Sequence, residues 1–393
     1  MRVLALHSRP LLLLSALFAA PLTTACGDDG GNSGSATDAT TTSTTDATTT
    51  ADSTTTDATT TADPTTTDAT TTATTTEEPT TTDDPTTGTT GAPADGPSVV
   101  FAFDPLQFQL PEGLDVRDGQ GYVGLVTGQV LALDVAAGEV SEFGGVVGIP
   151  PDNTAIMTGL VAGPDGEVYV AVDVFAPQEL VSGVYRIPAG GGQAELFASD
   201  PALLFPNGFA FEPDGDLLVT DSFSGTIFHV ALADGAVTPW KSDPLLAPNP
   251  DACGLPTQFH LGANGIAHAG DRVYVTNSDQ ASILEIAVEG DGSAGALTEF
   301  LATDCAALSG ADGLVIEPDS GDLLVPINYQ QRIIRVGADK QITTLAEGGI
   351  LQSPATLAWA PAGDAVLIAN AAFEATTMDP ATALPAILSL PIE

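Results

Sequence analysis

Residues 205–222 read FPNGFAFEPDGDLLVTDS, and this stretch decides the fold. An apolar run leads into a Pro-Asp-Gly turn at residues 213–215, and a second apolar run follows. Two later stretches repeat the plan, at residues 262–278 (GANGIA, then VYVTNS) and residues 310–325 (GADGLVIEPDSGDLLV). Short apolar runs between Gly, Asp and Pro are typical of β-strands joined by turns. From residue 98 onward the chain therefore predicts an all-β domain made of internal repeats.

Six repeats can be counted from the positions at which they open. They open at Gly113, Gly159, Gly208, Gly265, Gly313 and Thr356, at intervals of 46, 49, 57, 48 and 43 residues. Units of this length with three or four strands match the blades of a propeller rather than a sandwich or a barrel. We therefore expect a six-bladed β-propeller over residues 98–393. The last repeat has only three strands, and the apolar residues 99–103 can supply its missing edge strand and close the ring.

The residues before the propeller indicate export. Arg2 and Arg9 flank the start of an apolar run at residues 11–22, which is too short to span a bilayer. We interpret residues 1–25 as a signal peptide similar to those of bacterial lipoproteins, with Cys26 as the lipidated residue. The alternative is an ordinary secretory signal in which Cys26 is incidental. Residues 26–97 are rich in Thr, Ala and Asp, so we predict a disordered linker that tethers the propeller in the bacterial cell envelope.

The charge of the chain limits its partners. It has 9 basic and 51 acidic residues and a formal net charge of −42 at pH 7. Such a field repels phosphates, which excludes nucleic acids as partners. It also leaves the lipid anchor as the only expected contact with a membrane. Because the same field concentrates cations, we expect the protein to bind a divalent metal. We also expect a monomer that binds a small molecule.

One residue of each repeat would lie in a ring at one end of the propeller axis. In chain order the ring consists of Glu112, Thr158, Asn207, Asn264, Asp312 and Ala355. Carboxylate and amide oxygens suit a hard divalent cation, so Glu112, Asn207, Asn264 and Asp312 are candidate metal ligands. The alternative is that Asn-Gly and Asp-Gly are simply turn dipeptides. Each repeat has its hairpin turn elsewhere, however, and we expect these dipeptides to precede the first strand.

Further polar and aromatic residues would surround this ring. The second strands end in Asp173, Asp221, Asn277, Asn328 and Asn370. We expect these residues to cap loops or to hold the ring by hydrogen bonds. Nearby aromatic residues predict an apolar pocket mouth above a charged floor, and they are Phe175, Phe205, Phe223, Phe259, Tyr329 and Phe373. His260 could transfer a proton at the site, although a structural role is the commoner one for a single loop histidine.

The two remaining cysteines are expected to pair. Cys253 and Cys305 precede the openings of repeats four and five by eleven and seven residues. Adjacent blades would bring these two segments together, and export permits a disulfide bond. The alternative is two free thiols in separate loops.

The quoted phrases resemble the senescence-marker-protein/gluconolactonase (regucalcin-like) family and, more loosely, the NHL-repeat propellers. The resemblance covers about residues 105–393. It implies a divalent metal bound by Glu112, Asn207, Asn264 and Asp312, with Asp312 also the general base. Calcium is the expected ion, and zinc, manganese and magnesium are the alternatives. Sugar-lactone members of the family have an arginine where this chain has Phe205, so a hydrophilic sugar-acid lactone is not the expected substrate.

Two functions follow from these patterns. The first is a metal-dependent hydrolase of a lactone or ester, in which the metal polarises the carbonyl group and Asp312 accepts a proton from water. The second is a non-catalytic propeller that binds a ligand or partner and holds calcium as a structural ion. In both cases we expect Phe205, Phe223, His260, Asn328 and Tyr329 around the metal and a ligand that is partly apolar.

Overall fold

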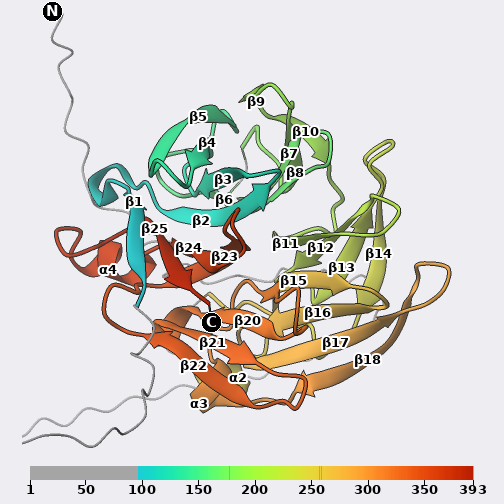
Figure 1. The fold of residues 1–393 in the computed structure, drawn as a ribbon. Helices are drawn as coiled ribbons and strands as arrows, with labels where there is room; N and C mark the ends of the chain where they lie inside the picture. The colour runs from blue at the N-terminus through green and yellow to red at the C-terminus, as the bar shows by residue number, and fades with distance from the viewer. Residues whose placement is uncertain (1–95, 177, 256, 258, 393) are drawn as a thin grey trace, which may run out of the picture. The chain divides into compact units, whose positions relative to one another are not determined.

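Six β-sheets are arranged around a common axis (Figure 1). The computed structural model describes residues 96–176, 178–255, 257 and 259–392. The predicted all-β, six-bladed propeller is confirmed, with one sheet for each repeat. The predicted signal peptide, Cys26 and nearly all of the predicted linker lie outside the described residues. Over the described ranges, no helix has the length and apolar character needed to cross a membrane.

The first three blades use their strands in chain order, with the first strand nearest the axis. Blade one contains β2 (Pro111–Arg117), β3 (Gln120–Leu125), β4 (Gln129–Asp134) and β5 (Glu139–Gly145). Blade two contains β6 (Ala155–Ala162), β7 (Val168–Val174), β8 (Gly183–Ile187) and β10 (Glu195–Ala198). Blade three contains β11 (Pro206–Phe211), β12 (Leu217–Asp221), β13 (Thr226–Val230) and β14 (Val237–Ser242). The short strand β9 (Gly192–Gln193) pairs in parallel with β5 and ties blade two to the edge of blade one.

The last three blades complete the circle. Blade four contains β15 (Ala263–Ala269), β16 (Arg272–Asn277), β17 (Ser282–Val288) and β18 (Ala294–Leu301). Blade five contains β19 (Val315–Ile316), β20 (Leu323–Ile327), β21 (Arg332–Val336) and β22 (Ile342–Glu347). Blade six contains β23 (Pro354–Trp359), β24 (Ala365–Asn370), β25 (Ala386–Pro391) and β1 (Ser98–Ala102). Because β1 pairs antiparallel with β25, the N-terminal strand closes the ring as predicted.

Short helices occupy some of the connections. They are η1 (Pro105–Gln107), α2 (Pro250–Cys253), α3 (Cys305–Leu308), η2 (Asn328–Gln330) and α4 (Phe373–Met378). The helices α2 and α3 begin at side-chain caps, in which Asn249 and Asp304 accept hydrogen bonds from backbone N–H groups of the first turn. The helix α4 lies between β24 and β25, in the long connection of blade six.

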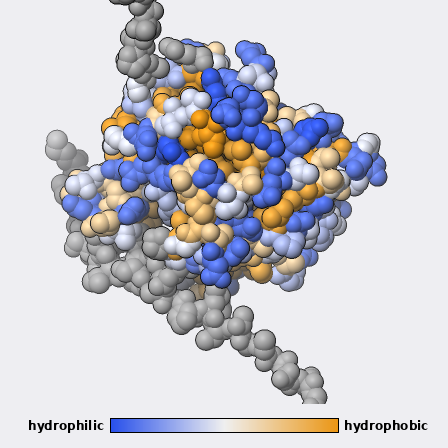
Figure 2. Space-filling model, turned by 90° about the horizontal axis from the view of Figure 1, so that it is seen from below, coloured by the Kyte–Doolittle hydropathy of each residue, from blue (hydrophilic) through white to orange (hydrophobic). Residues whose placement is uncertain are grey.

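The apolar core is divided among the junctions between neighbouring blades. Side chains alternate along each strand, so both faces of every sheet can pack against an adjacent blade. Apolar clusters fill the six junctions, and the closing one joins Leu114 and Leu125 of blade one to Leu367 and Ile387 of blade six. Each such fully buried side chain contributes roughly 2 kcal/mol of transfer free energy. On the face seen in Figure 2, apolar patches lie among hydrophilic side chains.

Candidate functional site

The ring residues are carried by a β-bulge that recurs from blade to blade. The register between the first two strands shifts between Pro206 and Phe209 in blade three, and at the equivalent place in blades one, two, four and six. The expectation that the dipeptides precede the first strand is therefore wrong for Asn207-Gly208 and Asn264-Gly265, whereas Asp312-Gly313 does precede β19. Glu112, Asn207 and Asn264 are the second residues of β2, β11 and β15. A bulge redirects the side chain that it carries, and these three side chains line a common cavity.

Close packing around the axis, rather than turn geometry, explains the glycines that follow the ring residues. These glycines are Gly113, Gly159, Gly208, Gly265 and Gly313, and none of them has a positive φ. A Cβ atom on Gly208 would lie 2.5 Å from the carbonyl oxygen of Asn264, and one on Gly265 would lie 2.5 Å from that of Asp312. Any side chain there would push neighbouring blades apart. The turn interpretation of these dipeptides is thus excluded, and the residue before each glycine is free to vary.

The ring opens into a cavity of about 770 Å³. Its floor contains all four candidate ligands and Thr158, and its walls are largely apolar. The predicted site residues that line it are Glu112, Asn207, Asn264, Asp312, Phe205, Phe259, Asn328, Tyr329 and Phe373. Phe175, Phe223 and His260 were also expected at this site and do not line it. The cavity therefore combines a polar, acidic floor with an aromatic wall, as the sequence predicts.

Glu112 and Asp312 are two buried carboxyl groups on this floor, 7% and 8% exposed. Burial, and then the charge of Asp312, raise the pKa of Glu112 well above its usual range. Burial also raises the pKa of Asp312 to about 7, although hydrogen bonds from Asn328, Asn264 and the Gly313 backbone act in the opposite direction. Oε2 of Glu112 has no hydrogen-bond partner among the described residues. A nearby positive charge would stabilise both groups in their ionised form.

The two ring asparagines are oriented by serines at the ends of the second strands. Asn207 Nδ2 donates to Ser222 Oγ at 3.2 Å, and Asn264 Nδ2 donates to Ser278 Oγ at 3.0 Å. Each serine hydroxyl in turn donates to a backbone carbonyl of the next blade. Because the amide nitrogens are held in this way, both Oδ1 atoms remain as acceptors on the floor.

Threonines two residues before these serines fix the backbone of the ring. Thr220 Oγ1 accepts from the Gly208 N–H at 2.8 Å and donates to the Asn264 carbonyl at 2.5 Å. Thr276 makes the corresponding bonds one blade further on. Neither the threonines nor the serines were among the predicted site residues. Their signal is the repeated triplet Thr-Asp-Ser at residues 220–222 and Thr-Asn-Ser at residues 276–278.

The ring is uneven, because blades two and six, which flank blade one, supply no comparable oxygen. Thr158 Oγ1 is bound to Asp173 Oδ2 at 2.9 Å and to the Pro206 carbonyl at 3.0 Å. Asp173 is completely buried, and this burial raises its pKa well above the usual range. Ala355 is buried and apolar. The candidate ligands therefore come from blades one, three, four and five.

This set of donors fits a hard divalent cation. It offers two carboxylates and two amide oxygens, which are ligands of the kind that calcium prefers. The unpartnered Oε2 of Glu112 and the repulsion between Glu112 and Asp312 both indicate that a positive charge belongs on this floor. The proposed donor set includes amide oxygens. Within the described ranges, no three His, Cys, Asp or Glu side chains are placed to hold a metal by themselves.

Phe205 is the centre of an aromatic cluster in the cavity wall. Its ring centroid lies 4.6 Å from that of Phe223, 5.4 Å from that of Phe259 and 5.9 Å from that of Phe175. Its backbone is also fixed, because Asp221 Oδ2 accepts from the Phe205 N–H at 2.8 Å. Phe205 therefore lines the cavity, while Phe223 packs against it from outside the lining.

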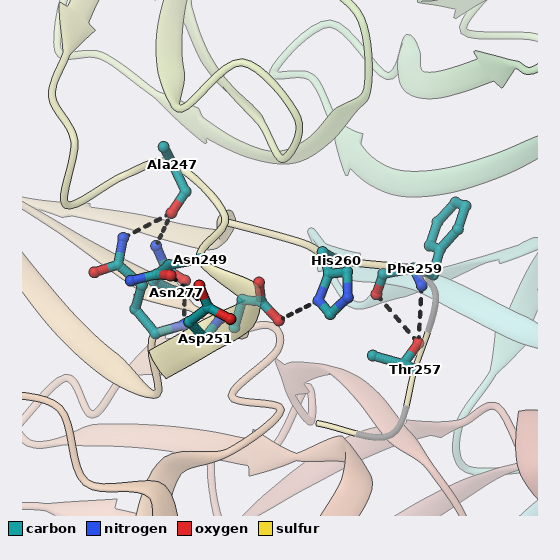
Figure 3. Close-up of polar contacts among 9 residues, drawn as sticks. Ala247, Asn249, Asp251, Thr257, Phe259, His260 and Asn277 are labelled. Atoms are coloured by element: carbon teal, nitrogen blue, oxygen red, sulfur yellow. Dashed lines mark hydrogen bonds and ion pairs between the residues drawn. The ribbon is translucent and has the colours of Figure 1, made fainter. Parts of the chain in front are cut away.

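His260 lies in the connection that carries Phe259, but its ring is engaged away from the cavity. His260 Nδ1 is 2.9 Å from Oδ1 of Asp279, a buried carboxyl group (Figure 3). In the same connection Thr257 Oγ1 accepts from the Phe259 N–H at 3.0 Å. These contacts hold the segment that supplies part of the aromatic wall. The geometry supports an anchoring role for His260 and gives no support to proton transfer.

Three residues of the second polar set cap loops. Asp221 accepts hydrogen bonds from four backbone N–H groups. Asn277 Nδ2 donates to the Ala247 carbonyl at 3.0 Å (Figure 3), and Asn370 Nδ2 donates to the Ile350 carbonyl at 3.1 Å. Asn328 differs from them, because its Nδ2 donates to Oδ2 of Asp312 at 3.0 Å. It is thus the member of this set that contacts a candidate ligand.

Cys253 and Cys305 form a disulfide bond, with their Cα atoms 5.5 Å apart. The bond joins the end of α2 to the start of α3, in the connections that lead into blades four and five. It spans 52 residues, and a loop of this length corresponds to a stabilisation of about 4 kcal/mol in the chain-entropy model. The connection bearing Phe259 is therefore covalently linked to its neighbour.

These features define a class: a six-bladed β-propeller with a buried, acidic floor at one end of its axis. Several solved structures have a similar fold. A calcium-binding protein, regucalcin, from Agrobacterium tumefaciens aligns with a TM-score of 0.54 and 18% identity, over 77% of this chain and 95% of that one. A luciferin-regenerating enzyme aligns with a TM-score of 0.55 and 14% identity, over 76% of this chain and 96% of that one.

A third structure shows how widely the fold is used. An auxiliary nutrient binding protein from Bacteroides thetaiotaomicron aligns with a TM-score of 0.51 and 10% identity, over 72% of this chain and 69% of that one. By sequence, the chain matches no protein-family model and no curated protein. The resemblance to the regucalcin-like family is thus confirmed for the fold, and function must be argued from the site.

Proposed function

We propose that this protein is a metal-dependent hydrolase of esters or lactones. Glu112, Asn207, Asn264 and Asp312 would hold the metal, and calcium is the ion that we propose. The observation that carries the proposal is the buried, unpartnered Oε2 of Glu112 on the same floor as a second buried carboxyl group. Calcium is favoured by the all-oxygen donor set and by the calcium binding of the regucalcin that shares the fold.

A cation bound on this floor would supply Lewis acidity to a substrate carbonyl and compensate the two carboxylates. The chain's own residues would do the rest. Asp312, a buried carboxyl group on the cavity floor, would accept a proton from a water molecule in the cavity. Asn328 holds one oxygen of that carboxyl group by a 3.0 Å hydrogen bond and so fixes its orientation. The aromatic wall around Phe205 would bind the apolar part of the substrate and exclude bulk water.

Metal content and turnover test this proposal together. The full-length protein, purified without chelators, should retain divalent metal at a one-to-one ratio by elemental analysis. A panel of esters and lactones should be hydrolysed, and both a chelator and Asp312→Asn should abolish that activity. Metal-free protein from a chelator-free preparation would contradict the metal site.

The competing proposal is a ligand-binding propeller with a structural calcium ion. One observation favours it: Asp312 would have to serve both as a metal ligand and as the proton acceptor, and Asn328 already binds it. In that case a chelator would lower the melting temperature while no ester or lactone is turned over.

We also propose that the protein acts outside the cytoplasm as a lipid-anchored monomer. Support comes from the signal-like residues 1–25 and from the disulfide bond, which is typical of oxidising compartments. Labelled fatty acid should be incorporated into the wild-type protein and not into a Cys26→Ser variant.

A further inference from the structure

The cavity has negative charges and no positive ones. Among the described residues that line it, Glu112, Asp312 and Glu374 are acidic, and none is lysine, arginine or histidine. Glu112 and Asp312 lie on the floor, whereas Glu374 is an exposed residue of α4 at the rim. A bound divalent cation would compensate the two floor carboxylates, but it would leave no net positive charge for an anionic ligand.

The basic residues of the propeller are all engaged or positioned elsewhere. The seven of them are Arg117, Arg186, Lys241, Arg272, Arg332, Arg335 and Lys340. Arg332 has a partner in the lining, since its guanidinium donates to Oε1 of Gln330, and it also donates to the Ala307 carbonyl. An anion entering the cavity would therefore meet no free donor of positive charge.

The wall opposite such an anion is aromatic and rigid. Phe205 is 1% exposed and contacts three other phenylalanine rings. It stands two residues before Asn207, and both residues line the cavity. A desolvated carboxylate against this ring would lose its hydration without gaining a partner. An uncharged alkyl or aryl group would instead gain the free energy of apolar burial.

We propose that the cavity selects substrates whose acyl part is apolar and uncharged, and that it rejects those carrying a carboxylate or phosphate near the reacting carbonyl. This inference rests on the proposed hydrolase activity for its kinetic test, but it concerns the cavity itself. It assigns Phe205 the role of a specificity-determining residue and Glu374 that of a rim charge that repels anions.

A matched pair of esters tests the selection. Phenyl pentanoate and the monophenyl ester of pentanedioic acid have the same chain length and leaving group, and they differ in a terminal carboxylate. With calcium-loaded, full-length protein, kcat/KM should be on the order of 100-fold higher for the uncharged ester. Equal values, or a preference for the charged ester, would overturn the inference.

Variants of two lining residues test which side chains cause this selection. Phe205→Ala should lower kcat/KM for the uncharged ester on the order of tenfold and change the charged ester little. Phe300→Ala is the matched control, because Phe300 also pairs with an aromatic ring, that of Tyr274, but does not line the cavity. Since Phe205 is buried, Glu374→Lys provides a test at an exposed position. It should narrow the ratio between the two esters several-fold by attracting the charged one; an unchanged ratio would remove Glu374 from the proposal.

A binding experiment separates this inference from the hydrolase proposal. Calorimetry with 4-phenylbutanamide and 4-phenylbutanoate compares an uncharged and an anionic ligand that cannot be hydrolysed. If no ester is turned over but the amide binds at least tenfold more tightly, the hydrolase proposal fails and the cavity's selectivity stands. If the carboxylate binds as tightly, or if neither ligand binds, the selectivity proposal is wrong whatever the activity.

Discussion

The ligand-bearing blades three and four and the ligand-free blades two and six share one backbone and differ in what they carry. Blades three and four place Asn207 and Asn264 on a bulge next to a close-packed glycine, and each amide is steered by a serine. Blade two has the same bulge and the same glycine, yet its Thr158 is bound to buried Asp173. Blade six has the bulge with Ala355.

This difference separates architecture from function. The bulge and the glycine recur where no ligand is present, so they are needed to pack the blades around the axis. The residue before the glycine is the variable part, and it carries an oxygen ligand in blades one, three, four and five only. Substitutions of the ligand residues should therefore impair cation binding, whereas substitutions of the glycines should impair folding.

Removing the carboxylate of Asp312 should have the largest effect. Asp312→Ala leaves Glu112 as the only carboxylate among the four proposed ligands. Calcium affinity should therefore fall on the order of 1,000-fold, which corresponds to about 4 kcal/mol. Calorimetric titration measures it. Thr158→Val, in a blade without a candidate ligand, is the control and should keep its calcium affinity within about threefold. A comparable loss in both variants would mean that the ligand-bearing and ligand-free blades do not differ in function.

Filling a glycine position should damage the fold and not the site. In Gly265→Ala the new Cβ would lie 2.5 Å from the Asp312 carbonyl oxygen, so the free energy of unfolding should fall by about 3 kcal/mol. Urea denaturation of the metal-free protein checks this value. Gly290→Ala is the matched control, because nothing lies within 4 Å of its Cβ position. A stable Gly265→Ala variant would return the dipeptides to the turn interpretation.

Much of the fold and of the ring can be predicted, because the repeat period and the spacing of the ring residues are visible in the sequence itself. Counting the repeats was enough to place Glu112, Asn207, Asn264 and Asp312 at equivalent points of a ring. What could not be predicted depends on contacts between blades. The carbonyl next to Gly265, the serine that holds Asn264 and the carboxyl group that holds His260 all belong to other segments of the chain. His260 and Phe223 looked like cavity residues because they are near it in sequence, and their side chains point elsewhere.

Loss of the steering serine should have an intermediate effect. In Ser278→Ala the Nδ2 of Asn264 loses the acceptor that now lies 3.0 Å away, and the amide becomes free to rotate its oxygen off the floor. We expect calcium affinity to fall on the order of tenfold, as for other residues that orient ligands. The measurement is the same titration, and Ser282→Ala offers a control, since Ser282 is also buried but lies on β17 and does not line the cavity. Equal affinities for Ser278→Ala and wild type would show that Asn264 is not a ligand.

The acidity of Asp312 should produce the smallest and most diagnostic effect. Its pKa in the folded chain is about 7, against a usual value of 3.8, so the folded state keeps a proton that the unfolded chain has already released. The metal-free protein should therefore lose stability as the pH rises from about 4 to about 7. Calcium binding must displace the same proton, so calcium affinity should rise between pH 6 and pH 8, and the raised pKa of Glu112 adds to this trend. Both trends should be weaker in Asp312→Asn, in which residue 312 cannot titrate. Affinity that is flat across this range would mean that the carboxylate of Asp312 is already ionised or is not a ligand, and the contrast between ligand-bearing and ligand-free blades would then depend on Glu112 and the two asparagines alone.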